Sequence, residues 1–505
     1  MAFFRSFLIF CLLLGTADAI PLAPLHDPEA FSHLEFSKNL AENLSEPQRQ
    51  SLIILQTKGK KIRALVPAAI KKEWDEKKIQ YRSLAYPSRG VELDPTYRSR
   101  LRKGCVPATE MLNGYKDDRL NELYLNCLQK EFPQIATLYV IGKSRLGRKI
   151  YALRIYLPEI QKQPQVNSFP PLFTEIRERV FINCAIHGNE AMAIEHCYEI
   201  IIKALTERES YPVLEKLELW IVPIVNPDGV HSFWHRSTAS GRKNGFVSGR
   251  ARRNLTEGVD LNRNFPFRWN TGNEKASSGV PGHGFFRGYA AASEPETKAV
   301  MNLVDKLRFS SIFSYHSYAN SLLVPYTIEG LVNPQPDIPG QLAERLLLGI
   351  ASEREDKPFL IKKNLYEVDG TDTDTFYNYY GSLAYLVESS HLYQDYRQVP
   401  AILQGIRPIW ENLLNFYAEV PMIRLQVTDE FSNPLRASIE FDQFVFKEGE
   451  QRGTAADGTF SMFMPGIKQC TLTIRAEGFA VRQLSLKPDV YPMRTIVIMK
   501  KSGNP

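Results

Sequence analysis

The chain has little that points to a membrane or to a nucleic acid. After the first twenty residues, no apolar run approaches the length of about 20 residues that a membrane-spanning helix needs. The formal net charge over 505 residues is only +6, whereas nucleic-acid-binding proteins concentrate basic residues on one face. The sequence also contains no internal repeat and no low-complexity tract. What remains is the composition of a globular protein of two or three domains, with 44% apolar and 23% charged residues.

Cysteine is scarce as well. None of the six cysteines stands in a CxxC pair, which argues against a zinc site with sulfur ligands. Cys105 and Cys127 flank one short segment, and we predict a disulfide between them. Cys184, in a strand-like run, and Cys197, in the helix-like run after it, are candidates for buried free thiols.

The first nineteen residues have the layout of an export signal. Arg5 gives the positive start, residues 7–14 form a short apolar run, and Ala17-Asp18-Ala19 provides a small-x-small cleavage site. We therefore predict a signal peptide at 1–19 and a mature protein that is exported, either secreted or periplasmic, without a membrane span. Export also permits disulfides.

The remaining chain divides into three zones. Residues 20–104 are polar and mixed in charge; a strand-like run at 51–55 and a charged helical stretch at 71–78 indicate a small folded unit to which we assign no function. Residues 105–418 alternate between helix and strand, which indicates an α/β layered domain. Residues 421–500 contain short alternating strands separated by turns, which predicts a small β-sandwich. The strands expected there are 423–427, 437–441, 459–463, 471–474 and 495–498.

A metal site is indicated by residues at the ends of predicted strands. His187 and Glu190 follow the continuous apolar run 180–186, and His316 ends the strand-like run 311–316. Ligands gather beyond the carboxyl ends of strands in open α/β sheets. Catalytic zinc takes three nitrogen or oxygen ligands from the protein and keeps one position for water.

Three more polar residues lie in similar settings. Asn262 and Arg263 stand in the run Gly258-Val259-Asp260-Leu261-Asn262-Arg263, and an arginine fork beside an asparagine can hold a carboxylate. Glu388 ends the apolar run 383–387. A carboxylate in such a position is unusual unless it is paired or catalytic.

Together these motifs resemble those of the funnelin zinc metallocarboxypeptidases, the family of carboxypeptidases A, B, N and E. The resemblance runs from about residue 115 to beyond Glu388. It implies a mixed twisted sheet flanked by helices, one Zn²⁺ per chain held by His187, Glu190 and His316, and Glu388 as general base. It further implies that Asn262 and Arg263 clamp the terminal carboxylate of the substrate and that Tyr366 is the mobile tyrosine that helps to anchor it.

Other implications of the resemblance are less direct. Arg242 is the nearest match to the carbonyl-polarising arginine, although Gly241 replaces the family's tryptophan and Arg253 competes for the role. Thr373 occupies the family position that separates a preference for apolar C-terminal residues of the substrate from a preference for basic ones. Asp369 and Asp372 could attract a basic side chain of the substrate or merely cap a turn. Rare cis bonds are implied at Ser317–Tyr318 and Pro325–Tyr326. The C-terminal sandwich resembles a transthyretin-like domain, and residues 20–104 could be an inhibitory pro-segment.

The resulting prediction is a monomeric zinc exopeptidase that acts on the C-termini of peptides or proteins through a metal-activated water. One alternative keeps the site and changes the substrate to a cell-wall peptide. Another is a non-catalytic peptide-binding module, which the presence of all three ligands and Glu388 argues against. The preferred C-terminal residue is left open.

Overall fold

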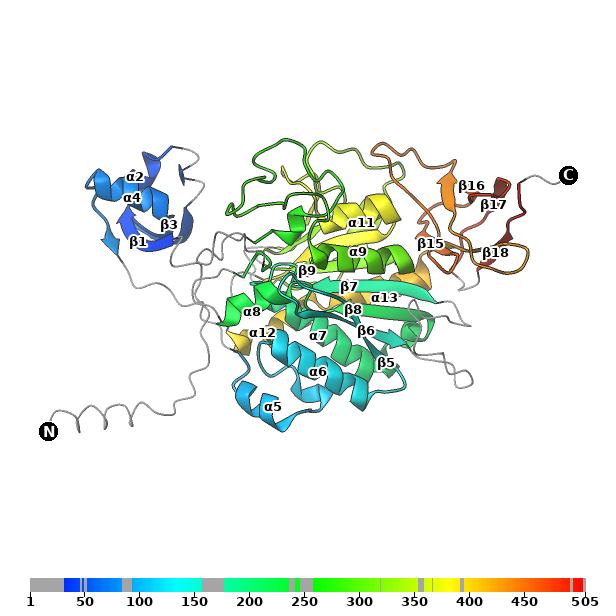
Figure 1. Ribbon diagram of the computed structural model, residues 1–505, viewed down its shortest axis with the longest axis horizontal. Helices are drawn as coiled ribbons and strands as arrows, with labels where there is room; N and C mark the ends of the chain where they lie inside the picture. Colours follow the sequence, from blue (N-terminus) through cyan, green and yellow to red (C-terminus); the bar gives the residue numbers. More distant parts are fainter. Residues whose placement is uncertain are drawn as a thin grey trace.

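The structure, a computed structural model, consists of three folded parts (Figure 1). It describes residues 31–45, 48–49, 52–83, 93–156, 177–235, 241–245, 258–317, 319–352, 358–365, 367–390, 395–490 and 494–502. The predicted signal peptide at 1–19 lies outside these residues. In the part that is described, no helix is both long enough and apolar enough to cross a membrane.

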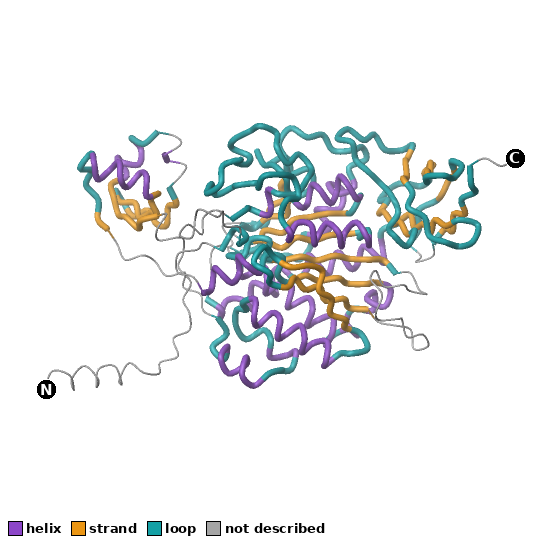
Figure 2. Tube along the Cα trace, viewed as in Figure 1, coloured by secondary structure: helices purple, strands orange, loops and turns teal. Residues whose placement is uncertain are grey.

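The N-terminal part has a sheet of its own (Figure 2) and a separate hydrophobic core. Its strands pair in the order β2-β3-β1-β4, and the core centres on Leu34, Phe36 and Trp74. The expected strand at 51–55 and the charged helix at 71–78 correspond to β2 and α4. The elements are β1 Phe31–Ser37, α2 Lys38–Glu42, β2 Ile53–Lys58, β3 Lys61–Pro67, α4 Ala68–Glu76 and β4 Arg82–Ser83.

The central part is built on an eight-stranded mixed sheet, counted over the described ranges, with the order β11-β10-β12-β9-β7-β8-β6-β5. Strands β12, β9, β7 and β8 run parallel to one another, and β6 and β10 join them in the antiparallel sense. The strands are β5 Ala136–Lys143, β6 Lys149–Tyr156, β7 Glu178–Cys184, β8 Leu217–Val222, β9 Ser311–His316, β10 Ser321–Leu323, β11 Leu360–Lys362 and β12 Leu383–Glu388.

Helices cover both faces of this sheet (Figure 2), as predicted. The central strands are buried on both sides because alternate residues point into different cores. In β7, Val180 and Ile182 join the core beneath α6, α7, α12 and α13, whereas Phe181 joins the core beneath α9 and α11. The helices are α5 Tyr97–Lys103, α6 Asp118–Glu131, α7 Ala191–Thr206, α8 Pro227–His235, α9 Pro295–Leu307, α10 Ile338–Leu346, α11 Asp372–Tyr380, α12 Val399–Ile406 and α13 Pro408–Glu419. The short 3-10 turns are η1 Ala108–Glu110, η2 Arg208–Ser210, η3 Pro212–Lys216, η5 Leu261–Arg263 and η6 Tyr396–Gln398.

Two disulfides brace the central part. The predicted bond Cys105–Cys127 is confirmed. The expectation of free thiols at Cys184 and Cys197 is wrong, because these residues form a second disulfide between the end of β7 and the second turn of α7. The loop between that strand and helix is short enough to bring the two cysteines together. Cys470 is a buried free cysteine.

The C-terminal part contains two three-stranded sheets, β15-β13-β18 and β14-β16-β17, whose apolar faces share one core through residues such as Leu425, Phe460 and Leu472. All the expected strands are present, and β17 was not predicted because its side chains are largely exposed. The strands are β13 Met422–Thr428, β14 Ser438–Phe441, β15 Thr459–Phe463, β16 Cys470–Arg475, β17 Arg482–Leu486 and β18 Thr495–Ile498. The resemblance of this part to a transthyretin-like domain stays a prediction.

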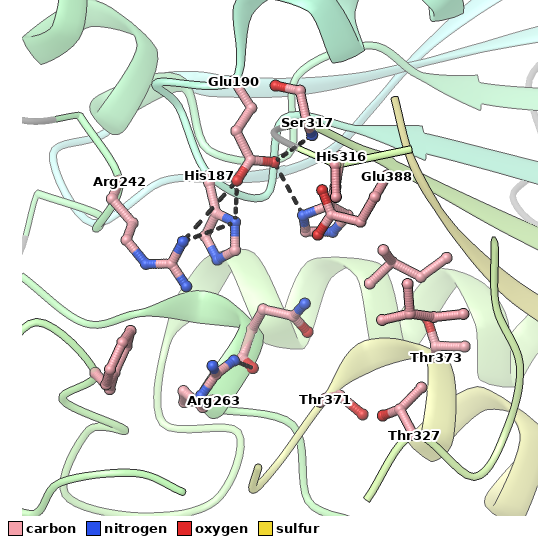
Figure 3. A pocket seen from close by; sticks show the side chains of 15 residues that line it. His187, Glu190, Arg242, Arg263, His316, Ser317, Thr327, Thr371, Thr373 and Glu388 are labelled. Carbon is pink, nitrogen blue, oxygen red and sulfur yellow. Dashed lines mark hydrogen bonds and ion pairs between the residues drawn. The ribbon is translucent and has the colours of Figure 1, made fainter. Parts of the chain in front are cut away.

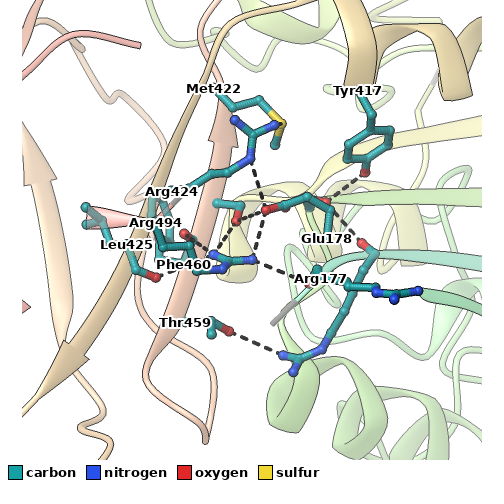
Figure 4. A network of polar contacts seen from close by, with 12 residues as sticks. Arg177, Glu178, Tyr417, Met422, Arg424, Leu425, Thr459, Phe460 and Arg494 are labelled. Atoms are coloured by element: carbon teal, nitrogen blue, oxygen red, sulfur yellow. Dashed lines mark hydrogen bonds and ion pairs between the residues drawn. The ribbon is translucent and has the colours of Figure 1, made fainter. Parts of the chain in front are cut away.

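A buried polar network joins the C-terminal part to the central sheet (Figure 4). At its centre is Glu178, the first residue of β7. One oxygen of its carboxylate accepts from Arg424 Nε at 3.2 Å, Arg494 Nη2 at 2.8 Å and Ser461 Oγ at 3.0 Å. All three donors come from the C-terminal part. The two parts are therefore fastened together by charge-assisted hydrogen bonds shielded from water.

Candidate active site

Four predicted site residues meet at one edge of the central sheet (Figure 3). Strands β7, β9 and β12 are parallel neighbours, so their carboxyl ends lie side by side. His187 and Glu190 follow β7, and His316 and Glu388 end β9 and β12. In the pairing of β12 with β9, Glu388 lies directly opposite His316.

His187, Glu190 and His316 form a compact set of metal-ligand atoms. Nδ1 of His187 lies 2.7 Å from Oε1 of Glu190, and Nδ1 of His316 lies 2.9 Å from Oε2 of the same carboxylate. The three side chains are buried, and one ligand atom from each lies within 4.8 Å of the others. Two imidazoles and a carboxylate are a ligand set that zinc accepts in catalytic sites.

The electrostatics of this group fit a cation. Burial alone would raise the pKa of Glu190, but His187 and His316 outweigh burial and hold it well below its usual range. Burial would lower the pKa of His316, yet the Glu190 carboxylate outweighs that effect and raises it to about 9. Without a metal, the pKa of His316 therefore favours a protonated ring beside the Glu190 carboxylate. A divalent cation bound to these ligands would displace that proton, as metal binding generally does.

Glu388 differs from the three ligands in its setting. Its side chain is partly exposed at the end of β12. Burial and the nearby negative charge of Glu190 raise its pKa to about 6. A carboxylate with this pKa, placed beside a metal site, is suited to take up and return a proton near neutral pH.

Asp260 is a site residue that our reading of the sequence missed. Its Oδ1 lies 3.0 Å from Nε2 of His187, and its Oδ2 accepts from Nε and Nη2 of Arg242 at 3.0 and 2.8 Å. A carboxylate behind a ligating histidine fixes the ring and its tautomer. The signal was its place two residues before Asn262, in the same run.

Arg242, Asn262 and Arg263 line the same cavity. Arg242 is held by Asp260, and its Nη1 lies 3.9 Å from Oε1 of Glu190. Asn262 and Arg263 belong to the turn η5, for which Asp260 is the N-cap. Arg263 donates from Nε to Ala276 O and from Nη1 to Asn262 O. These hydrogen bonds hold the guanidinium in place at the cavity wall.

Close backbone packing fixes the metal-binding loop. A side chain at Gly188 would bring a Cβ atom to 2.2 Å from the carbonyl carbon of Gly229, in the first turn of α8. Only glycine allows this approach. The loop that carries His187 and Glu190 therefore rests on the backbone of α8.

The cavity has a volume of about 300 Å³, and its far end is neutral. Thr373 lies there with Thr327 and Thr371, on the side away from Arg242 (Figure 3). Asp369 and Asp372 are fully buried and do not line the cavity. Asp369 accepts from Thr271 Oγ1 and Ser277 Oγ on a distant segment, whereas Asp372 accepts from the backbone of its neighbour, Thr373 N.

Some predictions fall outside the described residues: those for Tyr366, Arg253 and the Ser317–Tyr318 bond, whose second residue is not described. The other implied cis bond, Pro325–Tyr326, is confirmed.

Comparison with known proteins agrees with this geometry. The family model described as zinc carboxypeptidase matches residues 122–416. Carboxypeptidase A6 of Homo sapiens is 28% identical over 227 residues, 43% of this chain and 47% of the relative. Carboxypeptidase B of Bos taurus is 29% identical over 215 residues, 41% of this chain and 46% of the relative. The matches thus span about half the length of these curated relatives.

Solved structures of low sequence identity share the fold. Thrombin activatable fibrinolysis inhibitor superposes with a TM-score of 0.56 at 17% identity, covering 76% of this chain and 99% of that one. Carboxypeptidase A from Helicoverpa armigera gives 0.54 at 20% identity, covering 77% of this chain and 97% of the other.

The central part combines a mixed α/β fold with a ligand set of two histidines and a glutamate at the edge of its sheet. The chain belongs to the zinc carboxypeptidase family, as predicted from its motifs, and its cofactor is Zn²⁺.

Proposed function

We propose that the protein is a zinc-dependent exopeptidase that hydrolyses the C-terminal peptide bond of peptides or proteins. The observation that carries this proposal is the convergence, in one cavity, of three metal-ligand side chains, an acid–base carboxylate and an asparagine–arginine pair. Each member of this set has a role in cutting next to a free carboxylate.

His187, Glu190 and His316 would hold the zinc ion. When bound, the ion supplies Lewis-acid chemistry, because it polarises the scissile carbonyl and makes water a nucleophile near neutral pH. Glu388 takes the proton of the attacking water and delivers a proton to the leaving amine. Such acid–base assistance is typically worth about 10²–10⁴-fold in rate.

The two arginines of the cavity, Arg263 and Arg242, have different roles: one binds the substrate and the other stabilises the transition state. Arg263 and Asn262 bind the terminal carboxylate of the substrate, which fixes the cut one residue from the end. Arg242 is anchored by Asp260 and extends Nη1 toward the ligand group, so it can donate to the oxyanion that develops on the carbonyl. Fixed donors of this kind contribute about 2.7–4 kcal/mol to transition-state stabilisation. By family resemblance, Tyr366 contributes to anchoring the substrate.

The terminal side chain of the substrate would be uncharged. Thr373 shares the cavity lining with uncharged residues that include Leu323, Thr327 and Leu386, and neither Asp369 nor Asp372 lines the cavity. The carboxylates that line the cavity, Glu190 and Glu388, belong to the catalytic group. A lysine or arginine side chain directed at Thr373 would find no counter-charge on Thr327, Thr371 or Thr373, and burying an unpaired charge is costly.

The other parts of the chain receive simpler roles. Residues 1–19 direct export and are removed, and the mature protein is a monomer. The N-terminal part, with its separate core, is a pro-segment that limits access to the site, and the C-terminal part is a packing module. Limited proteolysis followed by an activity assay tests the pro-segment role of the N-terminal part. Its removal should raise activity, and a loss of activity contradicts this role.

A peptide series that differs only in the final residue tests the main proposal. Mass spectrometry should show loss of single residues from the carboxyl end, fastest for uncharged residues, and a chelator should abolish it. The matched control is the same peptide with a C-terminal amide, which should resist cleavage because Arg263 has no carboxylate to bind. Equal cleavage of the amide, or internal cleavage, would contradict the proposal.

A further inference from the structure

A second cluster of metal-ligand side chains lies between helices α6 and α8, outside the active-site cavity. Asp118 is the first residue of α6, and His231 and His235 lie one turn apart near the end of α8. Residues four apart on a helix lie on the same face, and the two imidazole centroids are 4.7 Å apart. One ligand atom from each residue lies within 4.8 Å of the others.

The partners of His235 prepare it to bind a cation. Its Nε2 lies 2.6 Å from Oδ2 of Asp117. This carboxylate is buried and also accepts from the Tyr97 hydroxyl at 2.7 Å and from Leu120 N at 2.8 Å. Because a carboxylate only accepts, Nε2 is the donor in this contact, and Nδ1 is the nitrogen left to bind a metal. His187 has the same arrangement in the active site, where Asp260 fixes its outer nitrogen.

Asp118 is oriented in a comparable way. Arg148 Nε lies 3.2 Å from its Oδ2, and its Oδ1 lies 3.1 Å from Nδ1 of His231. Two ligands of a tetrahedral zinc ion at ordinary bond lengths are about 3.3 Å apart. The nitrogen and oxygen are therefore already at a spacing that a cation would bridge in place of the shared proton.

The surrounding charge also favours a cation. The Arg148 guanidinium is shared between two carboxylates, Asp118 and Asp228, and a third, Asp117, lies against His235. His235 is the last residue of α8, where the negative end of the helix dipole lies. The three candidate ligands keep 13–21% of their side-chain surface exposed, which leaves an ion a path to the site.

We infer that Asp118, His231 and His235 form a second divalent-cation site, distinct from the active site, that takes Zn²⁺ or a similar metal with affinity for imidazole. Water completes the coordination. Bound there, the ion ties α6 to α8, and α8 supports the loop that carries His187 through the contact of Gly229 with Gly188. The site is structural, and the catalytic zinc is a separate ion.

Zinc counting on the full chain tests this inference. After removal of metal and equilibrium dialysis against Zn²⁺, mass spectrometry of the metal content should find two equivalents in the wild type. His187→Ala should retain one equivalent, the double variant His231→Ala/His235→Ala should retain one, and the triple variant none. His283→Ala, which alters a histidine of neither cluster, is the matched control and should keep both.

The outcomes separate this site from the proposed function. One equivalent in the wild type, or two in the double variant, overturns the second site, whereas loss of the ion in His187→Ala concerns only the active site. Asp118→Asn provides a milder variant that should also lose one equivalent. If the double variant does not fold, diethyl pyrocarbonate labelling of the wild type decides: Zn²⁺ should protect His231 and His235, and equal labelling with and without Zn²⁺ overturns the inference.

Discussion

Replacing Asp260 by asparagine should weaken zinc binding although it removes none of the three metal-ligand side chains. The carboxylate faces two ways: Oδ1 faces Nε2 of His187, and Oδ2 accepts two hydrogen bonds from Arg242. An amide of the same shape has only one oxygen. Whichever way it turns, its NH₂ group meets a donor, either the His187 ring or the Arg242 guanidinium.

The size of the effect can be worked out from these contacts. A hydrogen bond to a charged group contributes about 1.5–3 kcal/mol. Loss of the carboxylate behind a ligating histidine typically costs about 10–100-fold in metal affinity or activity, which is about 1.4–2.8 kcal/mol because each factor of ten is about 1.4 kcal/mol. The two estimates agree, so we expect Asp260→Asn to bind the catalytic zinc 10–100-fold more weakly, as an order of magnitude.

Competition with a chromogenic chelator measures this change. The matched control is Asp94→Asn, which alters an equally buried carboxylate paired with an arginine, Arg100, away from the cavity. It should lower the stability of the fold and leave zinc affinity unchanged. An Asp260→Asn protein with wild-type zinc affinity would refute the idea that Asp260 orients His187.

Three further predictions address other parts of the account. Glu388 must be ionised to act as a base, so kcat/KM should rise as the pH rises through the pKa of its carboxyl group. Burial and Glu190 raise that pKa to about 6, and bound zinc lowers it. A rise of kcat/KM that begins only above pH 6 contradicts this role. Glu178→Ala leaves Arg424 and Arg494 buried without their carboxylate and should lower the free energy of unfolding in urea by about 3–5 kcal/mol. The control Glu440→Ala removes an exposed pair with Arg475 and should cost under about 1 kcal/mol; equal effects in both variants count against the buried network. Thr373→Asp places a carboxylate at the neutral end of the cavity and should shift kcat/KM toward peptides that end in lysine or arginine, and an unchanged preference argues against Thr373 as a wall of the side-chain pocket.

The parts of the fold that local patterns specify could be predicted from the sequence. The apolar run at 180–186 predicts a strand buried on both faces, and β7 is such a strand. The motif His187-Gly188-Asn189-Glu190 follows it directly, so the carboxyl edge of the sheet could be named as the metal site. The short runs of alternating apolar and polar residues after residue 421 likewise predicted the strands of the C-terminal sheets.

What could not be predicted depends on contacts between distant residues or on weak patterns. The Cys184–Cys197 bond requires the geometry of the turn between β7 and α7, which spacing alone does not reveal. Strand β17 exposes most of its side chains and therefore lacks an apolar alternation. The cluster of Asp118 with His231 joins residues 113 apart in sequence, and only the packing of α6 against α8 brings them together.

The most direct test of the central claim is a paired measurement on Glu388→Gln. Zinc content and C-terminal residue release are determined on the same preparation, next to the wild type and to His187→Ala. We predict that Glu388→Gln keeps the zinc that His187→Ala loses, and that its release of terminal residues falls by at least about 10²-fold. Near-normal release of residues by Glu388→Gln with its zinc in place would contradict the assignment of this carboxylate as the general base.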